Sequence, residues 1–193
     1  MAKQITKLRS AKQSRSLVAL RRSRIDSHAI QGYIIETTDA LTLIQYVRDF
    51  TLDGLMVLRT RDITSVKLKS KTDALQHQVL LDDGIDLETI FAPDYPLDSW
   101  PELFAFLEND SPMLIIESEY GDDPEFLIGF ISEVFDTKLK LWHFTGAARW
   151  EDEPTEMRYD RVTCCQLNTT YINGYKRHFD RHPEQMIQLG ISQ

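Results

Sequence analysis

Hydrophobic and polar residues alternate in short runs along much of the chain, a pattern typical of half-buried β-strands. In the first half, five such runs predict strands over 16–22, 29–37, 41–47, 55–59 and 63–68. In the second half, five more predict strands over 113–117, 126–134, 139–144, 156–159 and 162–167. The Asp53-Gly54 pair is predicted to close the turn before the fourth strand. The chain is therefore expected to be mainly β.

Four segments instead have the three- to four-residue spacing of apolar positions that indicates amphipathic helices. One of them begins with Ser99-Trp-Pro-Glu102, the spacing of a capping box, in which a serine hydroxyl and a glutamate carboxylate satisfy free backbone N–H groups. An acidic stretch with Gly84, Pro93 and Pro96 precedes it and is predicted to be an irregular linker. The predicted helices lie at 5–14, at 72–81, from 99 onward and at 171–182.

The two halves of the chain are predicted to be copies of one unit. Gly32 and Gly129 are 97 residues apart, and the offset grows to 99 for Arg59 and Arg158. Small insertions at turns are expected in a duplicated β-rich module, because loops absorb added length and strands do not. The predicted fold class is α+β and mainly β, with two tandem five-stranded antiparallel small barrels and flanking helices. The predicted units are a first repeat at 1–82, a linker at 83–97 and a second repeat at 98–193.

One short motif, present in both copies, points to a known family. Gly54-Leu-Met-Val-Leu58-Arg59-Thr-Arg-Asp-Ile63 matches glycine, three residues, an apolar residue, Arg-Gly, two residues and an aliphatic one, except that threonine replaces the second glycine. The second copy keeps Arg158 but neither glycine. Each copy therefore resembles the Sm/LSm, or Hfq-like, small β-barrel, and the same pattern also suits other SH3-like barrels. The whole chain loosely resembles tandem-barrel bacterial proteins of no known function.

The resemblance implies RNA binding. In that family an arginine and an asparagine on adjacent loops, with an aromatic or a histidine, hold a single-stranded base. The asparagine is absent from both copies here. In an alternative interpretation, the two family arginines pack their stems on the barrels and pair with Asp39 or Asp136. The residues implied to contact RNA through the barrels are Arg59, Arg158, Lys140, Tyr33 and Tyr159.

The charges are distributed unevenly in this chain of 193 residues and net charge −8. Eight basic residues and no acidic ones precede Ile25, which leaves 14 basic and 30 acidic residues, a balance of −16, in the remainder. The basic segment predicts an anionic partner such as RNA, with Arg21, Arg22 and Arg24 as candidate contacts. The acidic remainder predicts instead a basic protein partner, or a strand added to a barrel edge. A third interpretation is a solvated helix face and a charged edge strand; a homo-oligomer is also compatible with the pattern.

Motifs that carry catalytic chemistry are absent from the sequence. It contains no phosphate-binding glycine-rich loop, no Cys-x-x-Cys pair, no His-Glu-x-x-His and no Gly-x-Ser-x-Gly. We therefore predict a non-enzymatic protein without a cofactor. His178 and His182, four residues apart on one helical face, are a weak candidate for a metal site, and no third ligand is indicated.

Two further features bear on the cellular compartment. Cys164 and Cys165 are adjacent in a predicted strand, so a disulfide between them is not expected, and one is expected to be in the core and the other exposed. No apolar run approaches the length of a membrane-spanning helix, and the N-terminal segment lacks the apolar centre of a signal peptide. A cytoplasmic protein with no membrane partner is predicted.

Overall fold

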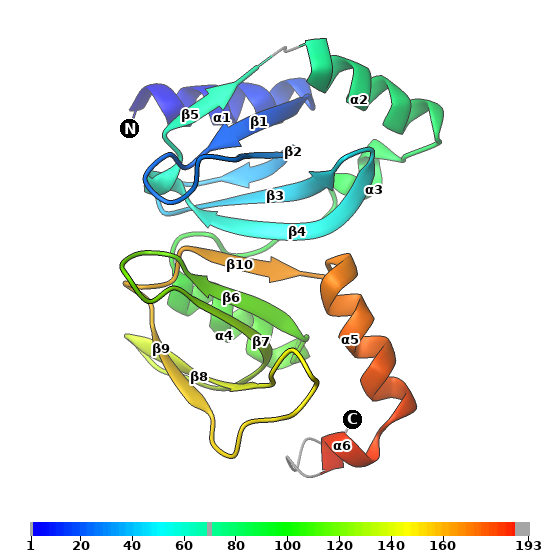
Figure 1. Ribbon diagram of the computed structural model, residues 1–193. Helices are drawn as coiled ribbons and strands as arrows, with labels where there is room; N and C mark the ends of the chain where they lie inside the picture. Colours follow the sequence, from blue (N-terminus) through cyan, green and yellow to red (C-terminus); the bar gives the residue numbers. More distant parts are fainter. Residues whose placement is uncertain (1, 69–70, 188–193) are drawn as a thin grey trace.

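The computed structural model describes residues 2–68 and 71–187, and its strands form one antiparallel sheet of ten strands with helices on both faces (Figure 1). The first half contains α1 (Ala2–Ser14), β1 (Leu17–Arg21), β2 (Ala29–Thr37), β3 (Leu41–Arg48), β4 (Thr51–Arg59), a 3-10 turn (Thr60–Asp62), β5 (Ser65–Lys67), α2 (Lys71–Asp82) and α3 (Leu87–Ile90). The second half contains α4 (Trp100–Asp110), β6 (Leu114–Ser118), β7 (Glu125–Val134), β8 (Lys138–His143), β9 (Thr155–Arg158), β10 (Cys164–Leu167), α5 (Thr170–Arg181) and α6 (Glu184–Ile187).

Strand order repeats between the two halves. It runs β5-β1-β2-β3-β4 and continues as β10-β6-β7-β8-β9, so each strand of the second half takes the place of its counterpart in the first. The halves join where β4 pairs with β10, with Leu58 opposite Cys164 and Leu55 opposite Leu167. The prediction of a mainly β fold with flanking helices is confirmed. The sheet is open rather than closed, so the prediction of two small barrels is not confirmed.

Close backbone packing explains the two equivalent glycines. A Cβ atom on Gly32 would lie 2.5 Å from the carbonyl oxygen of Gln45, and one on Gly129 would lie 1.8 Å from that of Trp142. A few residues later, β2 and β7 each have an irregularity in register, after Ile34 and after Ile131 respectively. Bulges and glycines let a strand bend sharply, so both halves curve at the same place.

The largest apolar core lies across the junction of the halves. It takes Leu41 and Val57 from the first half, Leu103 and Leu139 from the second, and Leu97 from the predicted linker. A second core lies under α1 and a third under α5. In Figure 1, α1 and α2 lie along the first half and α5 along the second. No helix among residues 2–68 and 71–187 combines the length and the apolar composition needed to cross a membrane.

Three local predictions are wrong. Asp53 and Gly54 lie inside β4, and the turn before it is at Asp49 and Phe50. Both cysteines are buried, because β10 lies in the middle of the sheet and its two faces meet different cores, Cys164 in one and Cys165 in the other. The linker is not wholly irregular, since it contains the short helix α3, which Asp86 caps by accepting a hydrogen bond from the Glu88 N–H. The serine half of the predicted capping box of α4 is confirmed, since the Glu102 N–H donates to Ser99 Oγ at 3.3 Å.

Candidate functional site

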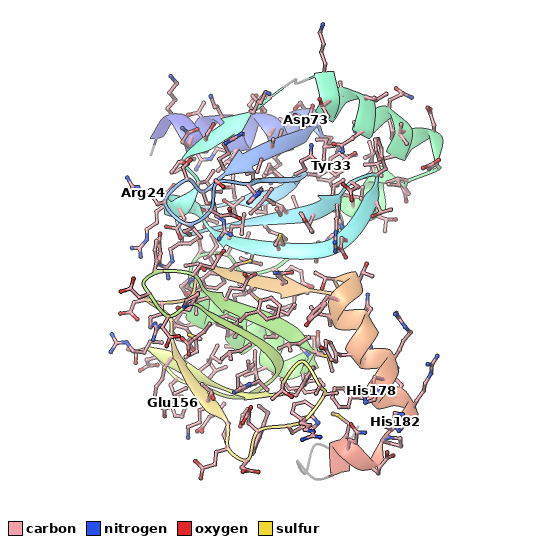
Figure 2. The ribbon with its side chains drawn as sticks, in the orientation of Figure 1. Arg24, Tyr33, Asp73, Glu156, His178 and His182 are labelled. Carbon is pink, nitrogen blue, oxygen red and sulfur yellow. The ribbon has the colours of Figure 1, made fainter. Side chains whose placement is uncertain are left out.

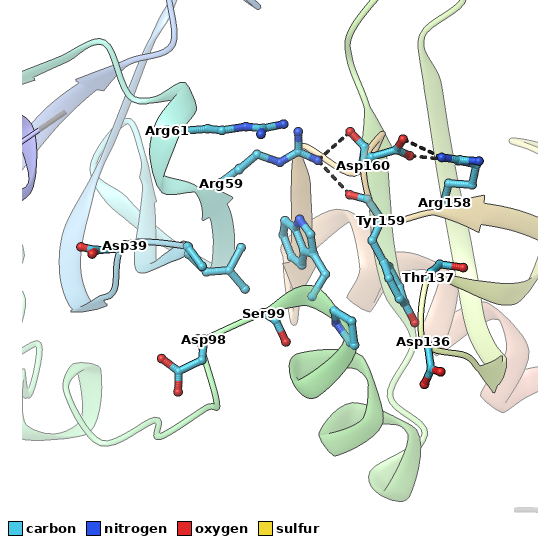
Figure 3. Close-up of a pocket in the computed structure, with 14 residues that line it drawn as sticks. Asp39, Arg59, Arg61, Asp98, Ser99, Asp136, Thr137, Arg158, Tyr159 and Asp160 are labelled. Atoms are coloured by element: carbon cyan, nitrogen blue, oxygen red, sulfur yellow. Dashed lines mark hydrogen bonds and ion pairs between the residues drawn. The ribbon is translucent and has the colours of Figure 1, made fainter.

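Equivalent loops of the two halves meet at a cleft of about 610 Å³, which we call the junction cleft (Figure 3). Asp39 and Asp136, 97 positions apart, both line it, as do Arg59 and Arg158. The fold thus brings together the two arginines that the family motif singles out. Its other charged lining residues are Arg61, Asp98 and Asp160.

Arg59 links the two halves of the chain within this cleft. Its Nη2 donates to the carbonyl oxygens of Tyr159 at 2.9 Å, of Asp160 at 3.0 Å and of Val162. Its Nη1 is buried and has no hydrogen-bond partner among the described residues. Burial and the nearby Arg61 lower the pKa of Arg59. The side chain therefore ties the end of β4 to the β9–β10 loop of the other half.

Arg158 lies on the outer side of the same cleft and is exposed. Its Nε and Nη2 donate to the Asp160 carboxylate at 3.1 Å and 2.8 Å, as Figure 3 shows. Neither Arg158 nor Arg59 pairs with Asp39 or Asp136, so the alternative interpretation names the wrong partners. Arg61 is exposed and makes no hydrogen bond or ion pair with any described residue.

The two tyrosines proposed as stacking faces lie in the core. Tyr33 is fully buried, its hydroxyl is 2.8 Å from His77 Nδ1, and burial raises its pKa to about 12. Tyr159 stacks on Phe104, donates its hydroxyl to the Phe135 carbonyl at 2.9 Å, and has a pKa raised by burial to about 12. Neither ring offers an exposed face in this conformation.

Arg22 is buried. Its guanidinium donates to both oxygens of Glu119, at 2.5 Å and 2.8 Å, and only 6% of its side chain is exposed. The pair links the segment after β1 of the first half to the segment after β6 of the second. Lys140, on β8, lies 3.4 Å from Glu133 and above the ring of Phe135, and its side chain is one-third exposed. These two cations are therefore already engaged within the chain.

Arg21 and Arg24 remain accessible. Arg24 lies on the exposed loop after β1 (Figure 2) and has no hydrogen bond or ion pair with a described residue. Arg21 donates to the Ser27 carbonyl at 3.3 Å and also lines a second hollow, of about 650 Å³, at the β5 end of the sheet. We call this hollow the basic groove. Its cationic lining residues are Lys7, Arg21 and Lys67.

Strand periodicity explains how the basic groove arises. Ala19 and Arg21 on β1, and Ser65 and Lys67 on β5, are two residues apart and so share one face of the sheet. The groove's carboxylate, Asp73 of α2, is 2% exposed and accepts a hydrogen bond from Gln31 Nε2 at 2.9 Å. The space stays open because three of its lining residues, Ala19, Ala29 and Ser65, have small side chains. Sequence reasoning missed Lys7 and Lys67, although alternation within 63–68 could have placed Lys67 beside Arg21.

The histidine pair does not assemble a metal site in the described part of the chain. His178 lies in α5 and His182 is the residue that follows its last turn, and their ring centroids are 4.7 Å apart (Figure 2). Their nearest polar partners are Gln185, 3.3 Å from His178 Nε2, and Glu184, 3.2 Å from His182 Nδ1. Within residues 2–68 and 71–187, no group of three His, Cys, Asp or Glu side chains is placed to hold a metal ion.

Comparisons with known proteins found no matching family model, no matching curated protein and no matching solved structure. The Sm-like resemblance therefore stays a prediction, and the functional argument depends on this chain's own surface.

Proposed function

We propose that the protein is a non-enzymatic binding protein that holds the phosphates of single-stranded RNA in the basic groove. The observation that carries this proposal is the convergence of Lys7, Arg21 and Lys67 on one hollow of about 650 Å³. Four of the six other basic residues of the N-terminal segment have an acidic partner: Arg9 with Asp39, Lys12 with Glu36, Arg15 with Glu88 and Arg22 with Glu119.

The groove has the electrostatic character that a polyanion needs. Lys67 and Arg21 are exposed, and Arg24 lies on the loop that follows β1. Lys7 Nζ donates to the Val66 carbonyl at 3.3 Å and, with three protons, keeps donors for a phosphate. Asp73, the carboxylate that lines the groove, is buried and accepts a hydrogen bond from Gln31, and it offsets one of these positive charges. Phosphate contacts of this kind give affinity without base specificity.

Salt dependence tests the proposal. Each phosphate that a cation neutralises on a single strand contributes about 0.7 to the slope of log K against log salt, so three contacts predict a slope of about −2. The double variant Arg21→Gln/Lys67→Gln should reduce the slope by about 1.4 and weaken binding at least about tenfold at low salt. Fluorescence anisotropy of a labelled single-stranded RNA, titrated at several salt concentrations, measures both quantities.

Arg158→Gln is the matched control, because Arg158 is an exposed arginine remote from the groove whose charge is paired with Asp160. It should leave the affinity and the slope unchanged. An undetectable or salt-independent interaction of the wild-type chain with RNA would sink the proposal. The control removes one positive charge and the groove variant two, so an equal loss per removed charge would assign the effect to net charge alone.

A second candidate function is a protein-interaction module, and a separate observation favours it. The outer edge of β9 has no strand partner among the described residues, and the loop before it exposes Glu151, Asp152 and Glu153. Open edges accept strands from partners, and this one would favour a basic segment. Failure to retard any RNA pool, together with capture of one basic protein at a fixed ratio, would favour this candidate.

A further inference from the structure

The strands at the two ends of the sheet are the counterparts of the two strands that pair at its centre. At the centre, β4 of the first half pairs with β10 of the second. The counterpart of β10 is β5, at one end of the sheet, and the counterpart of β4 is β9, at the other end. Repetition of the central junction between two chains would therefore pair β9 of one copy with β5 of a second copy, head to tail.

Side chains of α1 occupy the β5 edge. In the central junction, the Thr163 carbonyl accepts from the Arg59 N–H at 3.3 Å, and Cys165 pairs with Val57. Ninety-nine positions earlier, the corresponding carbonyls are those of Thr64 and Val66. They accept instead from Gln4 Nε2 at 2.8 Å and from Lys7 Nζ at 3.3 Å.

The described part of the second half, up to residue 187, has no such cap. Both α1 and α4 are followed by a residue with left-handed backbone geometry, Arg15 with φ 47° and Ser111 with φ 44°. Aligned on these two residues, α4 has Trp100 and Leu103 where α1 has Gln4 and Lys7. Trp100 and Leu103 are buried in the central core, so they leave the β10 edge open to β4. The helix with polar residues at these two positions covers an unpaired strand edge. The helix with apolar residues there leaves the edge of β10 free to pair with β4.

We propose that α1 caps the β5 edge, through Gln4 and Lys7, and thereby keeps the chain from assembling head to tail with further copies of itself. Covering an edge strand is a common defence against such pairing. In the register of the central junction, Ser65 would face Met157 and Val66 would face Glu156 of the second copy. Charges at the two ends are complementary, with Lys67 and Arg21 at the β5 end and the exposed Glu151, Asp152 and Glu153 beside β9.

Removal of the cap tests this inference. The double variant Gln4→Ala/Lys7→Ala keeps helix-favouring residues in α1 and frees both carbonyls. In sedimentation or light-scattering experiments without RNA, the wild-type chain should stay at its monomer mass of 22.4 kDa. The variant should rise with concentration to at least twice that mass. The single variant Gln4→Glu, which sets a carboxylate against the Thr64 carbonyl, should show the same trend more weakly.

A change at the other edge identifies the surface involved. The Tyr159 N–H donates to the Thr137 carbonyl at 3.1 Å, and alternation along an antiparallel strand then directs the Glu156 N–H away from β8. Glu156→Pro therefore removes an edge donor without breaking the β8–β9 ladder. Added to Gln4→Ala/Lys7→Ala, it should restore the monomer mass. Lys3→Ala/Ser10→Ala, at two exposed positions of α1, is the control and should remain monomeric.

Three outcomes would overturn the inference. Cap variants that keep the helical circular dichroism of the wild type and remain monomeric at all concentrations would show that the edge needs no cap. Association that survives Glu156→Pro would place the contact elsewhere. A wild-type chain that already associates, and that becomes monomeric when Glu156→Pro is introduced, would show that α1 does not block the edge. None of these readouts involves RNA, so they are independent of the proposed function.

Discussion

At the scale of single residues, two of the five arginines that the sequence marks for RNA, Arg22 and Arg59, instead hold the two halves together. Arg22 reaches Glu119, and Arg59 reaches three carbonyls of the β9–β10 segment. Arg22 and Glu119 are 97 positions apart and so occupy equivalent places in the two copies, one cationic and one anionic. Residue type alone predicts that such a side chain is charged, but it cannot predict a partner in the other half of the chain.

The Arg22–Glu119 pair gives a first prediction. Arg22→Met should lower the free energy of unfolding by about 3 to 5 kcal/mol, because it leaves the largely buried Glu119 carboxylate without its cation. Arg158→Gln, which breaks an ion pair whose arginine side chain is 71% exposed, should leave the free energy of unfolding close to the wild-type value. Urea denaturation measures both. Similar costs for the two variants would contradict the structural role assigned to Arg22, and Glu119→Leu should recover most of the loss in the Arg22→Met background.

At the scale of elements, alternation and apolar spacing predicted all ten strands and the four longer helices close to their observed positions. The errors come from long-range pairing. Gly54 has φ 73° and its Cβ would lie 2.4 Å from the Leu167 carbonyl, so this glycine meets the end of β10 instead of forming a turn. Cys164 and Cys165 are both buried because β10 joins the halves, which local periodicity cannot anticipate.

Among the residues proposed to contact RNA, Arg21 could be placed from the sequence, whereas Lys7 reaches the basic groove only through the packing of α1.

The bend in β7 gives a prediction about stability at the scale of elements. Gly129→Ala should destabilise the fold by about 3 kcal/mol, because the added methyl group would overlap the backbone of Trp142, which cannot move without breaking the ladder. Gly174→Ala, at an exposed position of α5 with no atom near the added methyl group, should stabilise by about 0.5 to 1 kcal/mol. Chemical denaturation of both variants tests the contrast. A harmless Gly129→Ala would mean that β7 and β8 do not approach as closely in solution.

At the scale of the whole molecule, duplication predicts two similar units but not the core that they share. Leu41 and Val57 of the first half pack in one cluster with Leu103 and Leu139 of the second, and Leu97 of the intervening segment belongs to the same cluster. With β4 and β10 also paired, unfolding of either half would expose apolar surface and strand edges of the other. The two copies are therefore expected to behave as one cooperative unit.

Tryptophan fluorescence tests this cooperativity, because Trp100, Trp142 and Trp150 all belong to the second half. Leu20→Ala removes a fully buried side chain from the core under α1, in the first half, and should cost about 2 to 5 kcal/mol. If the halves unfold together, the midpoint reported by the tryptophans should fall as far as the midpoint reported by far-ultraviolet circular dichroism. Leu75→Ala, at an exposed position of α2, should shift neither midpoint. A tryptophan midpoint that stays at the wild-type value in Leu20→Ala, while circular dichroism shows an earlier transition, would mean that the duplicated halves unfold independently despite their shared sheet.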